Sequence, residues 1–172
     1  IAETHIPTYT NGMGRGTVPP DSPEFLNRSR RDALQKIDCI VLAGTLLDFR
    51  MRFGQTIPAD AKIIQLEMDA ILIGQNRETD VPLVGNLACS FDALQEEMKA
   101  QGLQLDFSSW RDELRTIEVA AEAKVQAALT SDETPIDPQR MCREVRDWLD
   151  TLDDPLVIGD GGDIVATAAK IL

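Results

Sequence analysis

The chain has 172 residues, a length that suits one ordinary domain and is short for two. It carries 17 Lys and Arg against 29 Asp and Glu, a net charge of -12, so we expect no binding to nucleic acid or to an anionic membrane surface. Apolar residues make up 43% of the sequence, enough for a core, and no apolar run approaches the length of a membrane span.

The N-terminal part predicts loops before the first helix. Residues 6–10 have an extended character, and residues 11–16 form a loop with three glycines in six residues. Prolines keep residues 17–23 non-helical. Residues 22–24, Ser-Pro-Glu, have the pattern of a helix N-cap, a proline at the first helical position and an acidic first turn. This pattern predicts a basic helix from there to about Ile37.

Three apolar runs predict parallel β-strands. Residues 39–43 form a continuous apolar run, which is typical of a strand buried on both faces. Residues 62–69 predict a second strand that ends in an acid, and residues 81–84 predict a third. A helix is predicted over residues 89–100. The alternation of strands and helices predicts an α/β fold with a Rossmann-like, doubly wound and mostly parallel sheet.

After residue 106 the pattern becomes mainly helical. The expected elements are a long helix over 110–129, a polar linker over 130–138, a helix over 138–152 with Met141, Val145, Trp148 and Leu149 on one face, a strand over 156–158 and a final helix over 164–172. We therefore divide the chain into an α/β domain (residues 1–106), a helical bridge and linker (107–137) and the beginning of another domain (138–172).

Glycines and polar residues follow the predicted strands directly. Ligands of open parallel sheets bind at the carboxyl ends of the strands, where glycines let a ligand approach the backbone and an acid can accept hydrogen bonds from ribose. This pattern would suit an adenine nucleotide. Alternatively, Asp69 caps a turn, Arg50 is a surface charge and the glycines only permit tight turns. The residues concerned are Gly44, Thr45, Asp48, Arg50, Asp69, Gly85 and Asn86.

Two other glycine-rich segments are weaker candidates. Residues 159–162, Gly-Asp-Gly-Gly, stand between a predicted strand and a helix, which suits an anion at the helix N-terminus; alternatively this is a tight turn in which Asp163 caps the helix. The loop over residues 11–16 precedes prolines and no helix, so we expect it to be structural or to line a ligand.

Three cysteines and one histidine are the remaining candidates for reactive or metal-binding side chains. Cys39, Cys89 and Cys142 are scattered and lack a C-x-x-C pair, which favours buried, reduced thiols in a cytoplasmic protein over a disulfide framework or a zinc site. His5 is the only histidine and lies near the N-terminus, a poor place for a preorganised catalytic base.

Five segments together resemble a known family. The segments are NGMGRGTVPPDSP (11–23), AGTLLDFRMRFG (43–54), LEMDAILIGQNR (66–77), PIDPQRMCRE (135–144) and VIGDGGDIV (157–165). Their order and spacing resemble those in the central domain of thiamine-diphosphate-dependent enzymes, in particular of acetolactate synthase large subunits, and benzaldehyde lyase and oxalyl-CoA decarboxylase are related. The last two segments resemble the start of the family's diphosphate-binding domain.

The resemblance implies that the chain is part of a 2-keto acid decarboxylase or carboligase that uses thiamine diphosphate and Mg. The activating glutamate of the family lies in a domain that this chain lacks, so we assign no catalytic residue and expect the chain alone to be inactive. The resemblance also implies that Gly161, Gly162 and Asp163 approach the cofactor diphosphate. We assign no metal ligand, because the family's Gly-Asp-Gly metal motif continues to an Asn some two dozen residues later, and only 11 residues follow Gly161.

Central domains of this family bind FAD in acetolactate synthases, bind ADP in oxalyl-CoA decarboxylase, or are empty. The family's nucleotide-contacting positions correspond here to Gly44, Thr45, Asp48, Arg50, Asp69 and Asn86. Asn86 replaces the Asp that is usual in nucleotide-binding relatives, and residues 47–50 differ from the Arg-Phe-Asp-Asp run of FAD-binding enzymes, so both FAD and ADP stay open.

The expected partners are the remaining domains of the enzyme and further copies of it, in a dimer or tetramer. Two other functions stay open beside the thiamine-dependent enzyme. The first is a stand-alone module that binds FAD or ADP without catalysis. The second is a sirtuin-like NAD-dependent deacylase, which would have to use His5 as its catalytic histidine.

Overall fold

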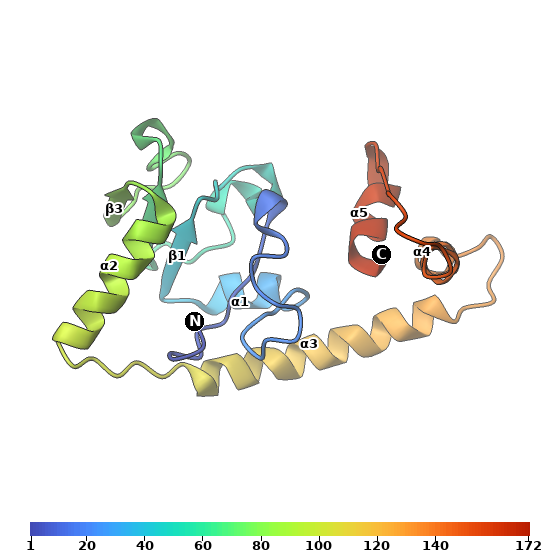
Figure 1. The fold of residues 1–172 in the computed structure, drawn as a ribbon, viewed down its shortest axis with the longest axis horizontal. Coiled ribbons are helices and arrows are strands. Elements are labelled where there is room, and N and C mark those ends of the chain that lie inside the picture. The colour runs from blue at the N-terminus through green and yellow to red at the C-terminus, as the bar shows by residue number, and fades with distance from the viewer. The chain divides into compact units, whose positions relative to one another are not determined.

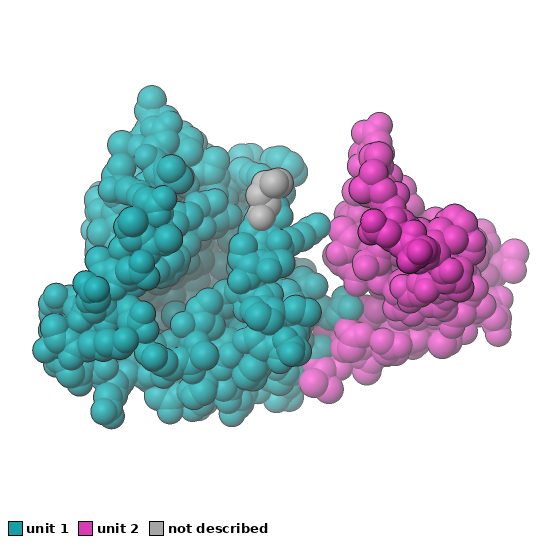
Figure 2. All heavy atoms as spheres, viewed as in Figure 1, with its two compact units in different colours: residues 1–118 teal, residues 119–172 magenta. Residues whose placement is uncertain are grey.

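The computed structural model describes residues 1–172 apart from the side chain of Met13, which belongs to the predicted glycine loop. The chain forms two compact units, residues 1–118 and residues 119–172 (Figure 2). Among the helices described, none combines the length and the apolar character needed to cross a bilayer.

The first unit contains a three-stranded parallel sheet with the strand order β1-β2-β3 (Figure 1). The strands are β1 (Cys39–Ala43), β2 (Lys62–Glu67) and β3 (Val81–Val84). The helix α2 (Leu87–Ala100) follows β3 directly. The predicted α/β class and parallel sheet are confirmed, and the strands lie within two residues of their predicted bounds.

The crossovers between the strands differ from a regular βαβ unit. The β1–β2 connection contains the 3₁₀ segment η2 (Phe49–Gly54), and the β2–β3 connection contains η3 (Ala70–Leu72). In neither connection does the described chain form an α-helix. The buried amide of Gln65 ties the second crossover to β2, since it donates to the Leu72 carbonyl and accepts hydrogen bonds from the Gly74 N–H and the Thr79 hydroxyl.

One face of the sheet carries the main core of this unit. Leu42 and Ile63 extend from neighbouring strands into a cluster completed by the first crossover and by α1 (Arg30–Lys36). Burial of such side chains contributes roughly 1.5 to 3 kcal/mol each. The buried members are Leu42, Leu47, Met51, Ile57, Ala61 and Ile63, and Leu34, Ile37 and Ile40 pack against them.

The prediction that residues 39–43 are buried on both faces is wrong. Leu42 is buried, but Val41 remains 41% exposed and Cys39 is exposed. Exposure alternates along this edge strand because only the face of β1 that points to the core is covered. The prediction of three buried thiols fails with it, since Cys89 is also exposed and only Cys142 is buried.

The predicted helix over residues 22–37 is too long, because only Arg30–Lys36 are helical. The preceding residues are held in an extended bridge between Thr8 and Phe25. The Thr8 N–H donates to the Glu24 carbonyl at 2.8 Å, and the Leu26 N–H donates to the Thr8 carbonyl at 3.0 Å. These bonds use backbone groups that a longer helix would need for its own ladder.

A carboxylate from α3 (Ser108–Leu129) takes over the role of helix cap at this place. Glu118 accepts hydrogen bonds from the backbone N–H groups of Asn27, Arg28 and Ser29 at 2.8–2.9 Å, and from the Ser29 hydroxyl at 2.8 Å. Burial raises the pKa of Glu118, but these donors outweigh burial and hold the pKa below its ordinary value. A half-buried anion thus satisfies the N–H groups that precede α1.

The Tyr9 hydroxyl extends this network, because it lies 2.9 Å from the Ser29 hydroxyl. Burial raises the pKa of Tyr9 to about 12. Around the polar groups lies an apolar cluster that joins α1 to the first half of α3. Its buried members are Leu26, Ala33 and Leu114, with Tyr9, Trp110 and Ile117 packed against them.

The second unit consists of the end of α3 together with α4 (Pro138–Leu149) and α5 (Gly162–Ile171). Its core contains Leu129, Cys142 and Ile171. The Asp137 side chain caps α4, accepting from the Gln139 N–H at 2.7 Å, with Pro138 at the first helical position. The predicted helices and linker are thus present.

The helix α4 forms as predicted, with Trp148 of its apolar face 59% exposed and Cys142 buried. One prediction for this unit is wrong. Residues 156–158 form no strand, and Leu156 and Ile158 are exposed. A strand needs a neighbour to pair its backbone groups, and no strand is described in residues 119–172.

We predict that Glu118→Gln destabilises the chain by about 1 to 3 kcal/mol, because a neutral amide loses the charge and keeps only one of the two oxygen atoms that accept from the N–H groups of residues 27–29. Glu113→Gln on the same helix is the matched control, since it removes only the exposed ion pair with Lys36 and should cost about 1 kcal/mol or less. Urea unfolding followed by circular dichroism measures both values. Equal destabilisation by the two variants would contradict the capping role.

Candidate functional site

The parallel register brings the residues after the three strands to one edge of the sheet. The Gly44 N–H donates to the Leu66 carbonyl and the Gly85 N–H donates to the Glu67 carbonyl, both at 2.9 Å. These bonds continue the ladder one residue beyond β1 and β3. The strand-end residues predicted from the sequence therefore stand at a common carboxyl edge, where open α/β sheets bind ligands.

Gly44 is required by the packing of the protein itself. Its φ is +59°, and a Cβ there would lie 2.9 Å from the Cδ1 atom of Leu87 at the start of α2. The positive φ in particular disfavours a larger residue here, whether or not a ligand is bound. The neighbouring Thr45 is half-buried behind this turn.

Asp48 and Arg50 form a closed ion pair at the start of η2. The Asp48 Oδ1 atom accepts from the Arg50 backbone N–H at 2.9 Å, and Oδ2 accepts from Nε at 2.9 Å and from Nη2 at 2.5 Å. The guanidinium also lies over the ring of Phe49, 5.6 Å from its centroid. The hydrogen bonds from Arg50 hold the pKa of Asp48 below its ordinary value.

The other two polar residues of this edge act as caps. The Asp69 carboxylate accepts from the Ile71 N–H at 3.0 Å at the start of η3, and the Asn86 Oδ1 atom accepts from the Cys89 N–H at 3.2 Å at the start of α2. Capping of the turn by Asp69, one of the two alternatives drawn from the sequence, is therefore confirmed. Both side chains are exposed, so their remaining lone pairs face solvent.

The sequence did not reveal that the glycine loop meets this edge. Gly12 has a φ of +51°, and a Cβ on it would lie 3.5 Å from Nη1 of Arg50. The loop was expected to be structural or to line a ligand, and this contact places it beside a predicted ligand residue. The three glycines were the available signal, but nothing in the sequence indicated which strand end they approach.

The strand ends also carry exposed apolar side chains, with Phe49 at 72%. Arg52 and Phe53, within η2, both have φ near +50°, a conformation that is costly for residues with a Cβ. Phe53 remains exposed in this turn. The edge thus combines charged, apolar and strained elements, which are frequent at functional sites.

The residues predicted to approach a cofactor diphosphate belong to the second unit. Gly161 and Gly162 have φ of +59° and +71°, and nothing lies within 4 Å of the Cβ position of either. Gly161 is the N-cap of α5 and no side chain caps this helix, so the alternative in which Asp163 serves as the cap is wrong. Asp163 lies in the first turn and is exposed.

His5 takes part in an ionic cluster away from these strand ends. Its Nδ1 atom lies 3.0 Å from Oε1 of Glu24 and 3.1 Å from Nη1 of Arg111, and the Glu24 side chain is only 3% exposed. The hydrogen bond with His5, followed by that with Ser22, lowers the pKa of Glu24 to about 2. The cluster ties the N-terminal segment to α3, which gives the deacylase hypothesis no support.

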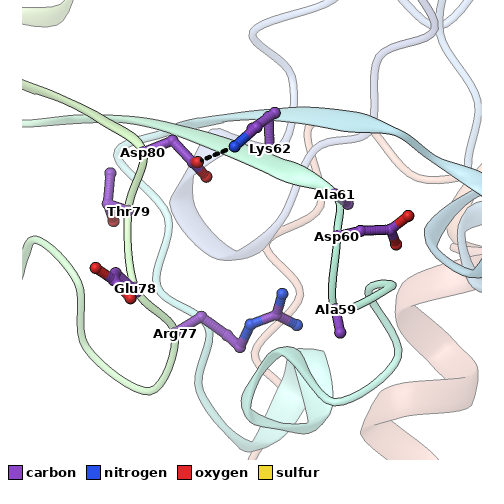
Figure 3. Close-up of a pocket in the computed structure, with 8 residues that line it drawn as sticks. All are labelled: Ala59, Asp60, Ala61, Lys62, Arg77, Glu78, Thr79 and Asp80. Atoms are coloured by element: carbon purple, nitrogen blue, oxygen red, sulfur yellow. Dashed lines mark hydrogen bonds and ion pairs between the residues drawn. The ribbon is translucent and has the colours of Figure 1, made fainter.

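A polar hollow of about 320 Å³ lies at the opposite edge, where β2 and β3 begin (Figure 3). Its cations are already engaged: Lys62 pairs with Asp80 at 2.7 Å, and Arg77 donates to the carbonyls of Gly54, Ile57 and Pro58. The lining residues are Ala59, Asp60, Ala61, Lys62, Arg77, Glu78, Thr79 and Asp80. None of the predicted site residues is among them.

Comparison with known proteins gives a family and several relatives. Residues 1–96 match the family described as thiamine pyrophosphate enzyme, central domain. The chain is 31% identical over its whole length to the acetolactate synthase large subunit IlvG of Mycobacterium tuberculosis and covers 30% of it. Over 97% of its length it is 31% identical to 2-hydroxyacyl-CoA lyase 2 of Bos taurus, covering 26% of that protein. The chain thus spans less than a third of these relatives.

We predict that Glu24 makes stability depend on pH in the acid range. Because its pKa is depressed in the folded protein, its carboxylate contributes stability that is present above about pH 4.5 and is lost as the pH falls toward about 2. The stability difference between the wild type and Glu24→Gln should therefore shrink over this interval. Urea unfolding from pH 6 down to the lowest pH that keeps the fold measures it, and parallel profiles would refute the assignment.

Proposed function

Since this chain belongs to the family of thiamine pyrophosphate enzymes, as a central domain, we propose that it serves an enzyme that decarboxylates or joins 2-keto acids. The observation that carries the proposal is the match over residues 1–96, which contain the whole parallel sheet. Similarity to an acetolactate synthase and to 2-hydroxyacyl-CoA lyases supports a reaction that makes or breaks carbon–carbon bonds. A module that binds nucleotides without catalysis is not favoured by these relatives.

The family implies thiamine diphosphate, and we propose that Mg accompanies it. The described residues alone do not form a site for either group. Gly161, Gly162 and Asp163 are exposed on an open turn, and no cluster of three or more His, Cys, Asp or Glu residues suited to a metal occurs among the described residues. We therefore assign no catalytic step to this chain and propose that it contributes structure and positioning.

A second role, binding of an adenine nucleotide such as ADP or FAD, has support at the carboxyl edge. Among the residues that the sequence predicted for this site, Arg50 is the cation, and its side chain is 51% exposed and lies against Gly12. Asp69 and Asn86 each keep exposed oxygen atoms that could accept from ribose. A nucleotide would thus lie across the strand ends, with its phosphates toward Arg50.

We further propose that the enzyme is a dimer or tetramer in the cytoplasm, in which this chain packs against the other domains. The exposed apolar residues support such contacts, among them Phe49 at the strand ends and Trp148 on α4. The three cysteines are free, which supports a reducing compartment.

The enzymatic role is tested on the protein encoded by the complete reading frame that contains these residues. It is expected to release carbon dioxide from a 2-keto acid such as pyruvate, or to cleave a 2-hydroxyacyl-CoA, only when thiamine diphosphate and Mg are both supplied. The 172-residue chain alone is the control and should show no turnover. Turnover without thiamine diphosphate, or none with either class of substrate, would refute the proposal.

The nucleotide role is tested by calorimetry with ADP and FAD. Arg50→Gln is expected to weaken ADP binding about tenfold or more, because charge-assisted hydrogen bonds contribute about 1.5 to 3 kcal/mol. Arg52→Gln is the matched control, because Arg52 is an exposed arginine two residues away, and it should change the affinity little. Absence of binding to the wild-type chain would exclude this role and leave the enzymatic one untouched.

A further inference from the structure

We propose that Asp48 is an internal competitor for the Arg50 guanidinium, and that a ligand phosphate binds at the sheet edge against this resident carboxylate. The inference rests on the proposed nucleotide role and gives the two residues opposite effects. Arg50 would attract the anion and Asp48 would weaken its binding. Resemblance alone places both among the nucleotide contacts, whereas their geometry separates them.

The first step of the argument is that Asp48 already holds the position of an anion. Its Oδ2 atom accepts from Nε at 2.9 Å and from Nη2 at 2.5 Å, which is how a guanidinium binds a phosphate oxygen. Its Oδ1 atom accepts from the Arg50 N–H and fixes the carboxylate in place. With an exposed fraction of 22% against 51% for Arg50, Asp48 is the more buried member of the pair.

The second step concerns the donors that remain. Among the described residues, no acceptor is hydrogen-bonded to Nη1 of Arg50. This atom lies beside Gly12, whose missing Cβ leaves open the space 3.5 Å away. Because the Arg50 side chain is 51% exposed, an incoming phosphate can approach Nη1 from solvent without moving Asp48, or can displace Asp48 and take the other donors.

The third step is electrostatic. In either pose the phosphate comes close to a carboxylate that neutralises Arg50. Two unit charges about 6 Å apart in water repel each other enough to change a dissociation constant about threefold. Asp48 therefore lowers the affinity for anions, and it does so without contacting the uncharged parts of a nucleotide.

The test uses Asp48→Asn, because asparagine keeps an oxygen that can accept from the Arg50 N–H. It removes the charge and replaces Oδ2, the acceptor of the guanidinium, by an amide NH2 group. Calorimetry compares three probes on the 172-residue chain, namely ADP, inorganic pyrophosphate and adenosine. Asp48→Asn is expected to tighten the binding of ADP and pyrophosphate about two- to fivefold, in line with the loss of an exposed charge pair. Adenosine, which has no phosphate, should bind as it does to the wild type.

Asp92→Asn is the matched control, because Asp92 is an exposed carboxylate on α2 that has no place in the proposed site. Equal gains in Asp48→Asn and Asp92→Asn would overturn the inference, since loss of any negative charge would then suffice. Unchanged or weaker ADP binding by Asp48→Asn would also overturn it, and would leave the nucleotide role intact if the wild type binds. Failure of every variant and the wild type to bind ADP would overturn both.

A second measurement covers the case in which Asp48→Asn does not fold. The Nε–H resonance of Arg50 in the wild-type chain, assigned by its loss in Arg50→Lys, reports on the contact with Oδ2 of Asp48. We expect pyrophosphate binding to weaken as the salt concentration rises. Binding should shift this resonance in either pose, because Nε and Nη1 belong to one guanidinium. Pyrophosphate binding that leaves the resonance unchanged would overturn the inference, because the anion would then bind away from Arg50.

Discussion

The carboxylate of Glu118 is the interaction on which the first unit depends. It accepts three backbone N–H groups in front of α1 and thereby joins two segments about ninety residues apart in sequence. The helix α1 in turn supplies side chains to the core beneath the sheet, and α3 supplies Leu114 to the neighbouring cluster. The half-buried carboxylate of Glu118 thus holds the start of a helix that packs under the sheet through Leu34.

The polar residues at the strand ends serve the fold as well as the proposed ligand site. Each polar group there already has a task in the protein: Asp69 and Asn86 cap helical segments, and Asp48 neutralises Arg50. A ligand at this edge would therefore share these groups with the fold. The affinity of such a site for a ligand depends on charge and on capping geometry together, because a substitution that changes one also changes the other.

Local patterns predicted the strands well because each is a short apolar run that ends at a glycine or an acid. They predicted the 22–37 helix poorly, since the bridge between Thr8 and Phe25 and the cap from Glu118 come from distant parts of the chain. The apolar run over residues 156–158 has the same appearance as β1 but has no strand to pair with. Of the site, the sequence predicted which residues stand at the strand ends, but not the Asp48–Arg50 pairing or the approach of Gly12.

The distribution of thiols has a practical consequence for spectroscopy. Cys39 and Cys89 are exposed in the first unit, whereas Cys142 is buried in the core of the second. Burial and the neighbouring acids Asp38 and Asp80 raise the pKa of the Cys39 thiol, which slows reagents that attack the thiolate at neutral pH. Fluorophores or spin labels can therefore be attached beside the sheet while the helical unit stays unlabelled. A slower, later reaction of Cys142 with the same reagent would then report opening of the helical unit.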